Sequence, residues 1–161
     1  MPAEMLIDGD PLALDRQVCF ALAVANRSVL GIYRPLLEPM GLTHPQYLVM
    51  LALWERSPRS VRDIGEAIQL DSPTLSPLLK RLEVSGLITR RRSADDERSL
   101  VVELTHAGVA MREAALQIPP AVIERLGVSL ADLEELHTVL TRVNAAARTA
   151  LRQAPNPRSE K

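Results

Sequence analysis

The chain has 161 residues, of which 47% are hydrophobic and 24% charged, the composition of an ordinary globular domain. Aromatic residues make up only 2%, so helices rich in Leu, Ala and Arg are favoured over a β-sandwich. The net charge of −1 excludes a uniformly basic protein, and the single cysteine excludes an internal disulfide. We expect a cytoplasmic protein, because we find neither a signal-peptide pattern nor an apolar run of membrane-spanning length.

The first predicted helix covers residues 11–40. Asp10 is placed to cap it, Pro11 occupies the first helical position, and Gly41 ends it. Cys19 then lies beyond the first turn, out of reach of the helix dipole. Apolar side chains recur along this helix at three- and four-residue steps, at Val18, Leu22, Ala25, Val29, Tyr33 and Leu36.

A second helix is predicted behind Thr43, which forms a capping box with Gln46. The run "YLVMLALWE" that follows is apolar on all sides, so we expect this helix to be buried. Tyr47 and Trp54 would then belong to the core.

Two shorter helices follow, with start signals at Ser60 and at Asp71 or Ser72, and with Gly86 as the stop of the second. Because only "QLDS" separates them, they form a helix-turn-helix candidate. Apolar residues then alternate in "SLVVEL", which is joined to "LITRRR" by the polar turn "SADDER", and this predicts a β-hairpin. Helices resume behind Thr105 and break at "QIPPAV". The last helix carries an apolar stripe of Leu130, Leu133, Leu136 and Leu140.

A helix-turn-helix followed by a basic hairpin predicts a mainly α fold with a small β-wing, the winged helix-turn-helix. Small polar side chains on the outer face of residues 72–85 suit a major groove, and hairpin arginines suit phosphates. Arg98 at the wing tip suits a narrow minor groove, and Asp96 would accept a hydrogen bond from an arginine there. The candidate DNA-binding residues are Ser72, Thr74, Ser76, Lys80, Arg81, Arg90, Arg91, Arg92, Asp96 and Arg98.

We assign residues 43–104 to the DNA-binding domain, residues 11–40 and 105–152 to dimerisation helices, and residues 153–161 to a disordered tail. The leucine stripe of the last helix needs a partner surface, which predicts a homodimer. Its two recognition helices would lie about one DNA turn, roughly 34 Å, apart on double-stranded DNA with an inverted repeat.

The chain resembles the MarR family of winged-helix transcription regulators over nearly its full length. The resemblance rests on "YRPLLEPMGLTHPQYLVMLALWE", on "LDSPTLSPLLKRLEVSGLITRRRSADDERSL" and on residues 104–108. "QVCFAL", "PQYL" and "LDSPTL" are similar to the branch of the organic hydroperoxide resistance regulators. The resemblance implies a homodimeric repressor without a cofactor, which releases DNA when an organic hydroperoxide oxidises its N-terminal cysteine, here Cys19.

The resemblance also implies tyrosine hydroxyls around the thiol. Tyr33 matches one of them, whereas Ala23 and His44 stand where the family typically has the other two, and we take His44 as the second thiol partner. Cys19 and Tyr33 are 14 positions apart. They lie roughly 21 Å apart along one continuous helix, so they can meet only between two antiparallel copies. Because no second cysteine exists, oxidised Cys19 would need a low-molecular-weight thiol to form a mixed disulfide.

The residues leave three functions open. The first is the oxidation-regulated repressor, and the second is a repressor regulated by a small lipophilic or phenolic ligand, with Cys19 as a core residue. The third, a thiol peroxidase, is disfavoured because no anion pocket of arginine and threonine and no supporting sheet surround Cys19. We expect no metal site, because His106 and His137 lack partners at ligand spacing.

Overall fold

The computed structural model describes residues 10–153. The chain divides into two compact units, one up to Val122 and one from Ile123 onward. The predicted domain limits remain a prediction. In chain order the elements are η2 (Leu14–Arg16), α1 (Val18–Leu37), η3 (Glu38–Met40), α2 (His44–Glu55), β1 (Arg59–Ser60), α3 (Val61–Ile68), α4 (Ser72–Val84), β2 (Ile88–Arg92), β3 (Leu100–Leu104), α5 (His106–Ala115), α6 (Ile118–Leu126) and α7 (Leu130–Gln153).

The N-terminal helix begins later than the sequence predicted. The Asp10 carboxylate does not cap α1; it accepts a hydrogen bond from the N–H of Leu12 at 2.9 Å, which closes a local turn. The Gln17 side chain, at the end of η2, donates to the carbonyl oxygen of Pro11 at 2.8 Å and so fixes this turn against η2. Such local side-chain hydrogen bonds compete with the helix. The predicted start of the helix at residue 11 was therefore wrong. α1 itself ends at Leu37, and the 3-10 turn η3 continues to Met40, so the predicted stop at Gly41, in the left-handed region with φ of 68°, is confirmed for the helical run as a whole.

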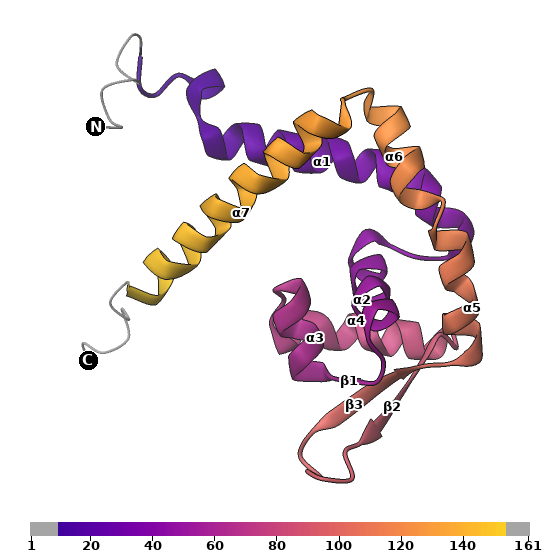
Figure 1. Ribbon diagram of the computed structural model, residues 1–161. Coiled ribbons are helices and arrows are strands. Elements are labelled where there is room, and N and C mark those ends of the chain that lie inside the picture. Colours follow the sequence, from indigo (N-terminus) through magenta and orange to yellow (C-terminus); the bar gives the residue numbers. More distant parts are fainter. Residues whose placement is uncertain (1–9, 154–161) are drawn as a thin grey trace. The chain divides into compact units, whose positions relative to one another are not determined.

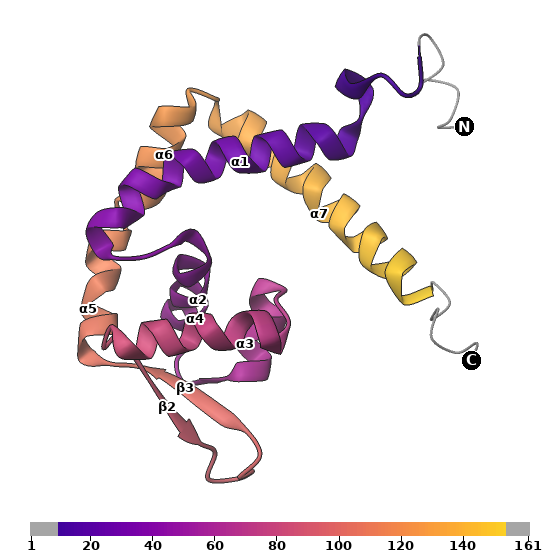
Figure 2. The same cartoon turned by 180° about the vertical axis from the view of Figure 1, so that it is seen from behind.

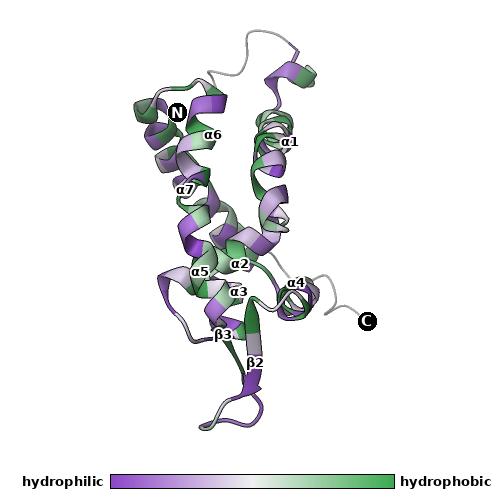
Figure 3. Ribbon diagram, turned by 90° about the vertical axis from the view of Figure 1, so that its right-hand side faces the viewer, coloured by the Kyte–Doolittle hydropathy of each residue, from purple (hydrophilic) through white to green (hydrophobic). Residues whose placement is uncertain are grey.

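The wing is a three-stranded antiparallel sheet in the order β1–β3–β2. β2 and β3 pair along their whole length, which confirms the predicted hairpin, and the hairpin projects from the group of α2, α3 and α4 (Figures 1 and 2). Its far end is hydrophilic (Figure 3). The sequence did not indicate β1, because two residues are too few to alternate. Since β3 is central, β2 is an edge strand, and the N–H groups on its outer side need partners from elsewhere.

The helix-turn-helix is built on local caps and one apolar face. The side-chain oxygens of Thr43, Ser60, Asp71 and Thr105 each accept a hydrogen bond from the N–H three residues on, so these predicted helix starts are confirmed. α4 turns its leucines inward as predicted. These leucines are all buried: Leu75, Leu78, Leu79 and Leu82.

At Gly108, α5 closely approaches the chain just before β2. A Cβ at this position would lie 2.1 Å from the carbonyl oxygen of Leu87, so the helix can pack here only with glycine. The carbonyl oxygen of Gly108 also accepts a hydrogen bond from Nε1 of Trp54 at 2.9 Å. Trp54 is half-buried and Tyr47 is buried, so both lie in or beside the core as expected.

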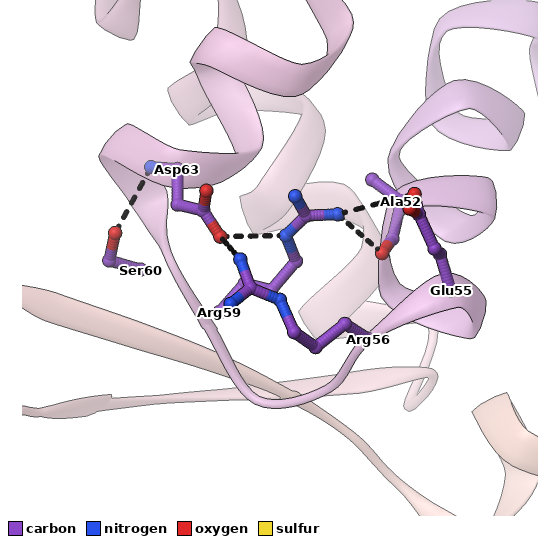
Figure 4. Close-up of polar contacts among 6 residues, drawn as sticks. All are labelled: Ala52, Glu55, Arg56, Arg59, Ser60 and Asp63. Atoms are coloured by element: carbon purple, nitrogen blue, oxygen red, sulfur yellow. Dashed lines mark hydrogen bonds and ion pairs between the residues drawn. The ribbon is translucent and has the colours of Figure 1, made fainter.

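Arg59 ties the end of α2 to α3 (Figure 4). Its Nε donates to the Asp63 carboxylate at 2.7 Å, and its Nη1 donates to the carbonyl oxygen of Ala52 at 2.9 Å. The Glu55 carboxylate lies 3.7 Å from the same Nη1. The Arg59 side chain is 9% exposed, whereas that of Arg56, which also donates to Asp63, is 64% exposed. The buried Arg59 side chain therefore links α2 to α3.

The break between α5 and α6 is confirmed. Pro119 and Pro120 lie in the first turn of α6, where the missing N–H groups cost no helical hydrogen bond. In the second unit α7 has no buried residue, and Leu130 and Leu136 are 58% and 51% exposed. The predicted disordered tail lies outside the described residues, except for Gln153, which ends α7. Within residues 10–153 no helix combines the length and apolarity needed to cross a membrane.

Candidate DNA interface and thiol site

The outer face of α4 presents short polar and basic side chains to solvent. Asp71 caps this helix by accepting a hydrogen bond from the N–H of Thr74 at 2.9 Å. Hydrogen bonds from Thr74, first from its side chain and then from its N–H, lower the pKa of the Asp71 carboxyl. The exposed candidate residues of this helix are Ser72, Thr74, Ser76, Lys80 and Arg81. This face has the chemistry that reads base edges and phosphates in a major groove.

The tip of the wing is held by hydrogen bonds to its backbone. The Asp96 carboxylate accepts from the N–H of Arg98 at 3.0 Å, and the Asp96 carbonyl oxygen accepts from the N–H of Ser99 at 2.9 Å. The sequence predicted that Asp96 accepts from an arginine; the donor is the backbone of Arg98, not a guanidinium. Arg98 is exposed, and no ion pair among residues 10–153 involves its guanidinium, so this group is accessible at the wing tip.

The three consecutive arginines of β2 have different surroundings. Arg91 is 53% exposed and lies 3.7 Å from Glu103 on β3, and exposed Arg92 donates to a carbonyl oxygen of the turn. Arg90, in contrast, is half-buried and makes three hydrogen bonds to Glu83 of α4. The sequence had placed all three on phosphates and had not indicated Glu83, because a contact between a helix end and a later strand has no periodic signal. Arg91 and Arg92 are the arginines that the fold leaves facing outward.

Cys19 is exposed and is the second residue of α1. The sequence had placed it beyond the first turn, and this was wrong because α1 begins at Val18. In the single chain Cys19 is therefore an accessible thiol and not part of a core.

The two predicted thiol partners lie together. The rings of Tyr33 and His44 meet edge to face with centroids 4.8 Å apart, and Tyr47 lies 6.0 Å from Tyr33. Burial raises the pKa of Tyr33, so its hydroxyl keeps its proton and can donate a hydrogen bond. Burial lowers the pKa of His44, so at neutral pH this imidazole carries no charge. Cys19 is distant from both, since α1 runs unbroken between Cys19 and Tyr33.

A cavity of about 490 Å³ lies where α1 meets α2. Its size is that of a site for a small molecule. Its lining is charged at Arg34 and Glu38. It is apolar at Leu30 and Leu42, so the cavity could contact both the polar and the apolar part of an amphipathic ligand. The cavity is lined by Leu30, Arg34, Glu38, Gly41, Leu42, Thr43 and His44.

The capped helix-turn-helix, the exposed face of α4 and the basic hairpin together define a winged-helix transcription regulator. The family model of the transcriptional regulator SarA/Rot matches residues 31–114. The organic hydroperoxide resistance transcriptional regulator of Bacillus subtilis (strain 168) is 43% identical over 131 residues, which cover 81% of this chain and 89% of that protein. The chain belongs to the MarR family of winged-helix regulators, in the branch of the organic hydroperoxide resistance regulators.

Solved structures agree with this assignment. The structure of reduced AbfR bound to DNA matches with a TM-score of 0.77 and 32% identity, over 94% of this chain and 99% of that chain. Overoxidised AbfR bound to DNA matches with a TM-score of 0.65 and 36% identity, over 81% of this chain and 95% of that chain. AbfR is a protein of Staphylococcus epidermidis. The predicted fold class, mainly α with a small β-wing, is confirmed.

Proposed function

We propose that this protein is a homodimeric repressor that binds an inverted-repeat operator and releases it when an organic hydroperoxide oxidises Cys19. The observation that carries the proposal is the position of the only cysteine, exposed in the first turn of α1. The relative from Bacillus subtilis, named for organic hydroperoxide resistance, and the DNA-bound structures of AbfR support it.

The surface of α1 favours a dimer. Leu37 is the only buried residue of this 20-residue helix, and apolar side chains around the cysteine, such as Val18 and Phe20, are 65% and 40% exposed. Apolar area of this kind is stabilised by covering it. A second, antiparallel copy of α1 would cover it and would bring its Tyr33 hydroxyl to Cys19, a contact that one chain cannot make.

The oxidation is a two-electron step. The Cys19 thiolate attacks the outer oxygen of the hydroperoxide; the O–O bond breaks, the alcohol leaves with a proton, and Cys19 becomes a sulfenic acid. A low-molecular-weight thiol then condenses with the sulfenic acid, which forms a mixed disulfide and releases water. Apolar neighbours such as Phe20 favour organic peroxides over hydrogen peroxide.

The added group would act through packing. A mixed disulfide is larger and more polar than a thiol, and a close-packed helix interface cannot accept it without moving helices. Since each wing must match one half of the inverted repeat, a shift of the dimer helices would separate the two recognition helices from their half-sites.

A gel shift tests the proposal on the duplex that the reduced wild-type protein selects from a random-sequence pool. Wild-type protein and Cys19→Ser are compared with and without cumene hydroperoxide, each with and without a low-molecular-weight thiol. The thiol arm is needed because AbfR is described on DNA in both the reduced and the overoxidised form. Both proteins should bind when reduced, and only the wild type should release DNA after oxidation. Equal release of Cys19→Ser, or release of neither, would reject Cys19 as the sensor.

A ligand-regulated repressor is the second candidate, and the cavity beside His44 is the observation that favours it. A lipophilic phenol would then release DNA from the wild type and from Cys19→Ser alike, without any oxidant. We propose a regulator and not an enzyme in either case, so a peroxide-consumption assay should show no turnover beyond one equivalent for each Cys19.

A further inference from the structure

A single ion pair joins the recognition helix to the wing. Glu83 lies in the last turn of α4, and Arg90 lies in the middle of β2. One Glu83 oxygen accepts from the N–H of Arg90 at 3.2 Å, and the other accepts from its Nε and Nη2 at 3.0 and 2.6 Å. The side chains of Glu83 and Arg90 are 37% and 23% exposed, so the pair is partly shielded from solvent.

The pair supplies β2 with a hydrogen-bond acceptor and supplies the carboxylate of α4 with a cation. The N–H of Arg90 lies on the outer side of an edge strand, where β3 cannot reach it, and Glu83 supplies its acceptor. A carboxylate near the C-terminus of a helix is unfavourable for the helix dipole, so Glu83 gains its stabilisation from Arg90 and not from its own helix. The hydrogen bonds from the Arg90 side chain lower the pKa of the Glu83 carboxyl, so the pair stays charged at neutral pH.

We propose that Glu83 and Arg90 are positioning residues that fix the angle between α4 and the wing, so that a major groove and the adjacent minor groove are engaged together. In this role the Arg90 guanidinium does not contact a phosphate, unlike the guanidinium groups of Arg91 and Arg92. The inference rests on the proposed DNA binding and adds to it the residues that set the geometry of the two contacts.

The direction in which Glu83→Gln changes operator affinity distinguishes a positioning role of Glu83 from a purely electrostatic one. Glu83→Gln removes a negative charge beside the DNA, so electrostatics alone would tighten binding to every sequence and steepen its salt dependence. If Glu83 positions the wing, Glu83→Gln should instead weaken operator binding by about tenfold and leave nonspecific binding unchanged or tighter. The ratio of specific to nonspecific affinity should therefore fall, which a merely local loss of stability in a folded protein would not cause.

The matched control is Glu103→Gln. It also removes one negative charge, from β3 of the wing instead of from α4, but the arginine contact of Glu103 at 3.7 Å is long and exposed. Its operator affinity should equal or exceed that of the wild type. The charge swap Glu83→Arg with Arg90→Glu keeps the net charge and rebuilds the side-chain pair, although an arginine at position 83 cannot accept from the N–H of residue 90. The swap should therefore recover part of the operator binding and bind clearly better than Arg90→Glu alone. If Arg90 contacted a phosphate, the swap would bind no better than Arg90→Glu alone.

The experiment measures anisotropy of the full-length reduced proteins on the selected duplex and on a scrambled duplex, at several salt concentrations. Thermal unfolding of each variant shows that it is folded. Operator binding of Glu83→Gln that is as tight as that of Glu103→Gln, or a charge swap without recovery, would overturn the inference. Failure of the wild type to prefer the selected duplex would instead reject the proposed DNA binding, so the two failures are distinguishable.

Discussion

Replacing Arg59 with alanine removes the side chain that holds the end of α2 to α3 (Figure 4). Two hydrogen bonds disappear, one of 2.7 Å to the Asp63 carboxylate and one of 2.9 Å to the carbonyl oxygen of Ala52. Asp63 keeps Arg56 as a partner, whereas the carbonyl oxygen of Ala52 loses the cation that caps the C-terminal end of α2. The change therefore affects both helices of the junction.

The magnitude follows from these contacts. A hydrogen bond to a charged group contributes about 1.5–3 kcal/mol, and an arginine held in one geometry loses about 2 kcal/mol of rotamer entropy. Because the two bonds are coupled through one side chain, we expect Arg59→Ala to lower the free energy of unfolding by about 2–3 kcal/mol. For a chain of this size that corresponds to a fall of the unfolding midpoint by roughly 4–12 °C.

Urea unfolding at pH 7, followed by circular dichroism, measures this change. Arg56→Ala is the matched control, because its side chain donates to the same carboxylate but is 64% exposed. It should cost less than about 1 kcal/mol. Equal effects of the two substitutions would refute the reasoning, since burial of Arg59 would then have no energetic consequence.

Three further predictions follow from the described contacts. Gly108→Ala places a Cβ 2.1 Å from a carbonyl oxygen and should lower the free energy of unfolding, measured in urea, by about 3 kcal/mol. A Cβ at Gly31 would have no atom within 4 Å, so Gly31→Ala should raise the free energy of unfolding by about 0.5–1 kcal/mol by stabilising α1. The hydrogen bond from Arg59, followed by the charges of Arg59 and Arg56, lowers the pKa of Asp63 below 3.8. The stabilisation that Asp63 contributes is therefore complete well above pH 3.8 and is lost as the pH falls below 3.8 towards the lowered pKa. Asp63→Asn should flatten this acid limb of the profile of stability against pH. Arg98→Ala should weaken operator binding by about 1–3 kcal/mol, while Arg91→Ala should weaken binding to all sequences and lower the salt slope by about one, both measured by anisotropy.

Features that depend on neighbours in the chain were predictable from the sequence. The caps at Thr43, Asp71 and Thr105 act on the N–H three residues on, so the residue types alone indicate them. The leucine face of α4 and the hairpin follow from periodicity. Asp10 failed as a cap because a turn two residues long competes for the same carboxylate, and the choice between turn and helix depends on Gln17.

Features that depend on distant residues were not predictable. The contacts of Arg59 with Ala52 and of Arg90 with Glu83 each span seven positions across an element boundary, where no helical or strand period applies. The proximity of Tyr33 and His44 depends on the turn between α1 and α2, which the sequence places only approximately. The position of Cys19 in the first turn was also missed, because it depends on where α1 begins.

The most direct test of the central claim measures Cys19 and DNA in the same sample. The reduced wild-type protein on its selected duplex is titrated with cumene hydroperoxide in the presence of a low-molecular-weight thiol. Intact-mass spectrometry gives the fraction of Cys19 that carries the mixed disulfide, and anisotropy gives the fraction of DNA released. The account predicts that the two fractions rise together, that a reductant reverses both, and that Cys19→Ser shows neither. DNA released while Cys19 is still a thiol, or DNA retained when Cys19 is fully modified, would contradict it.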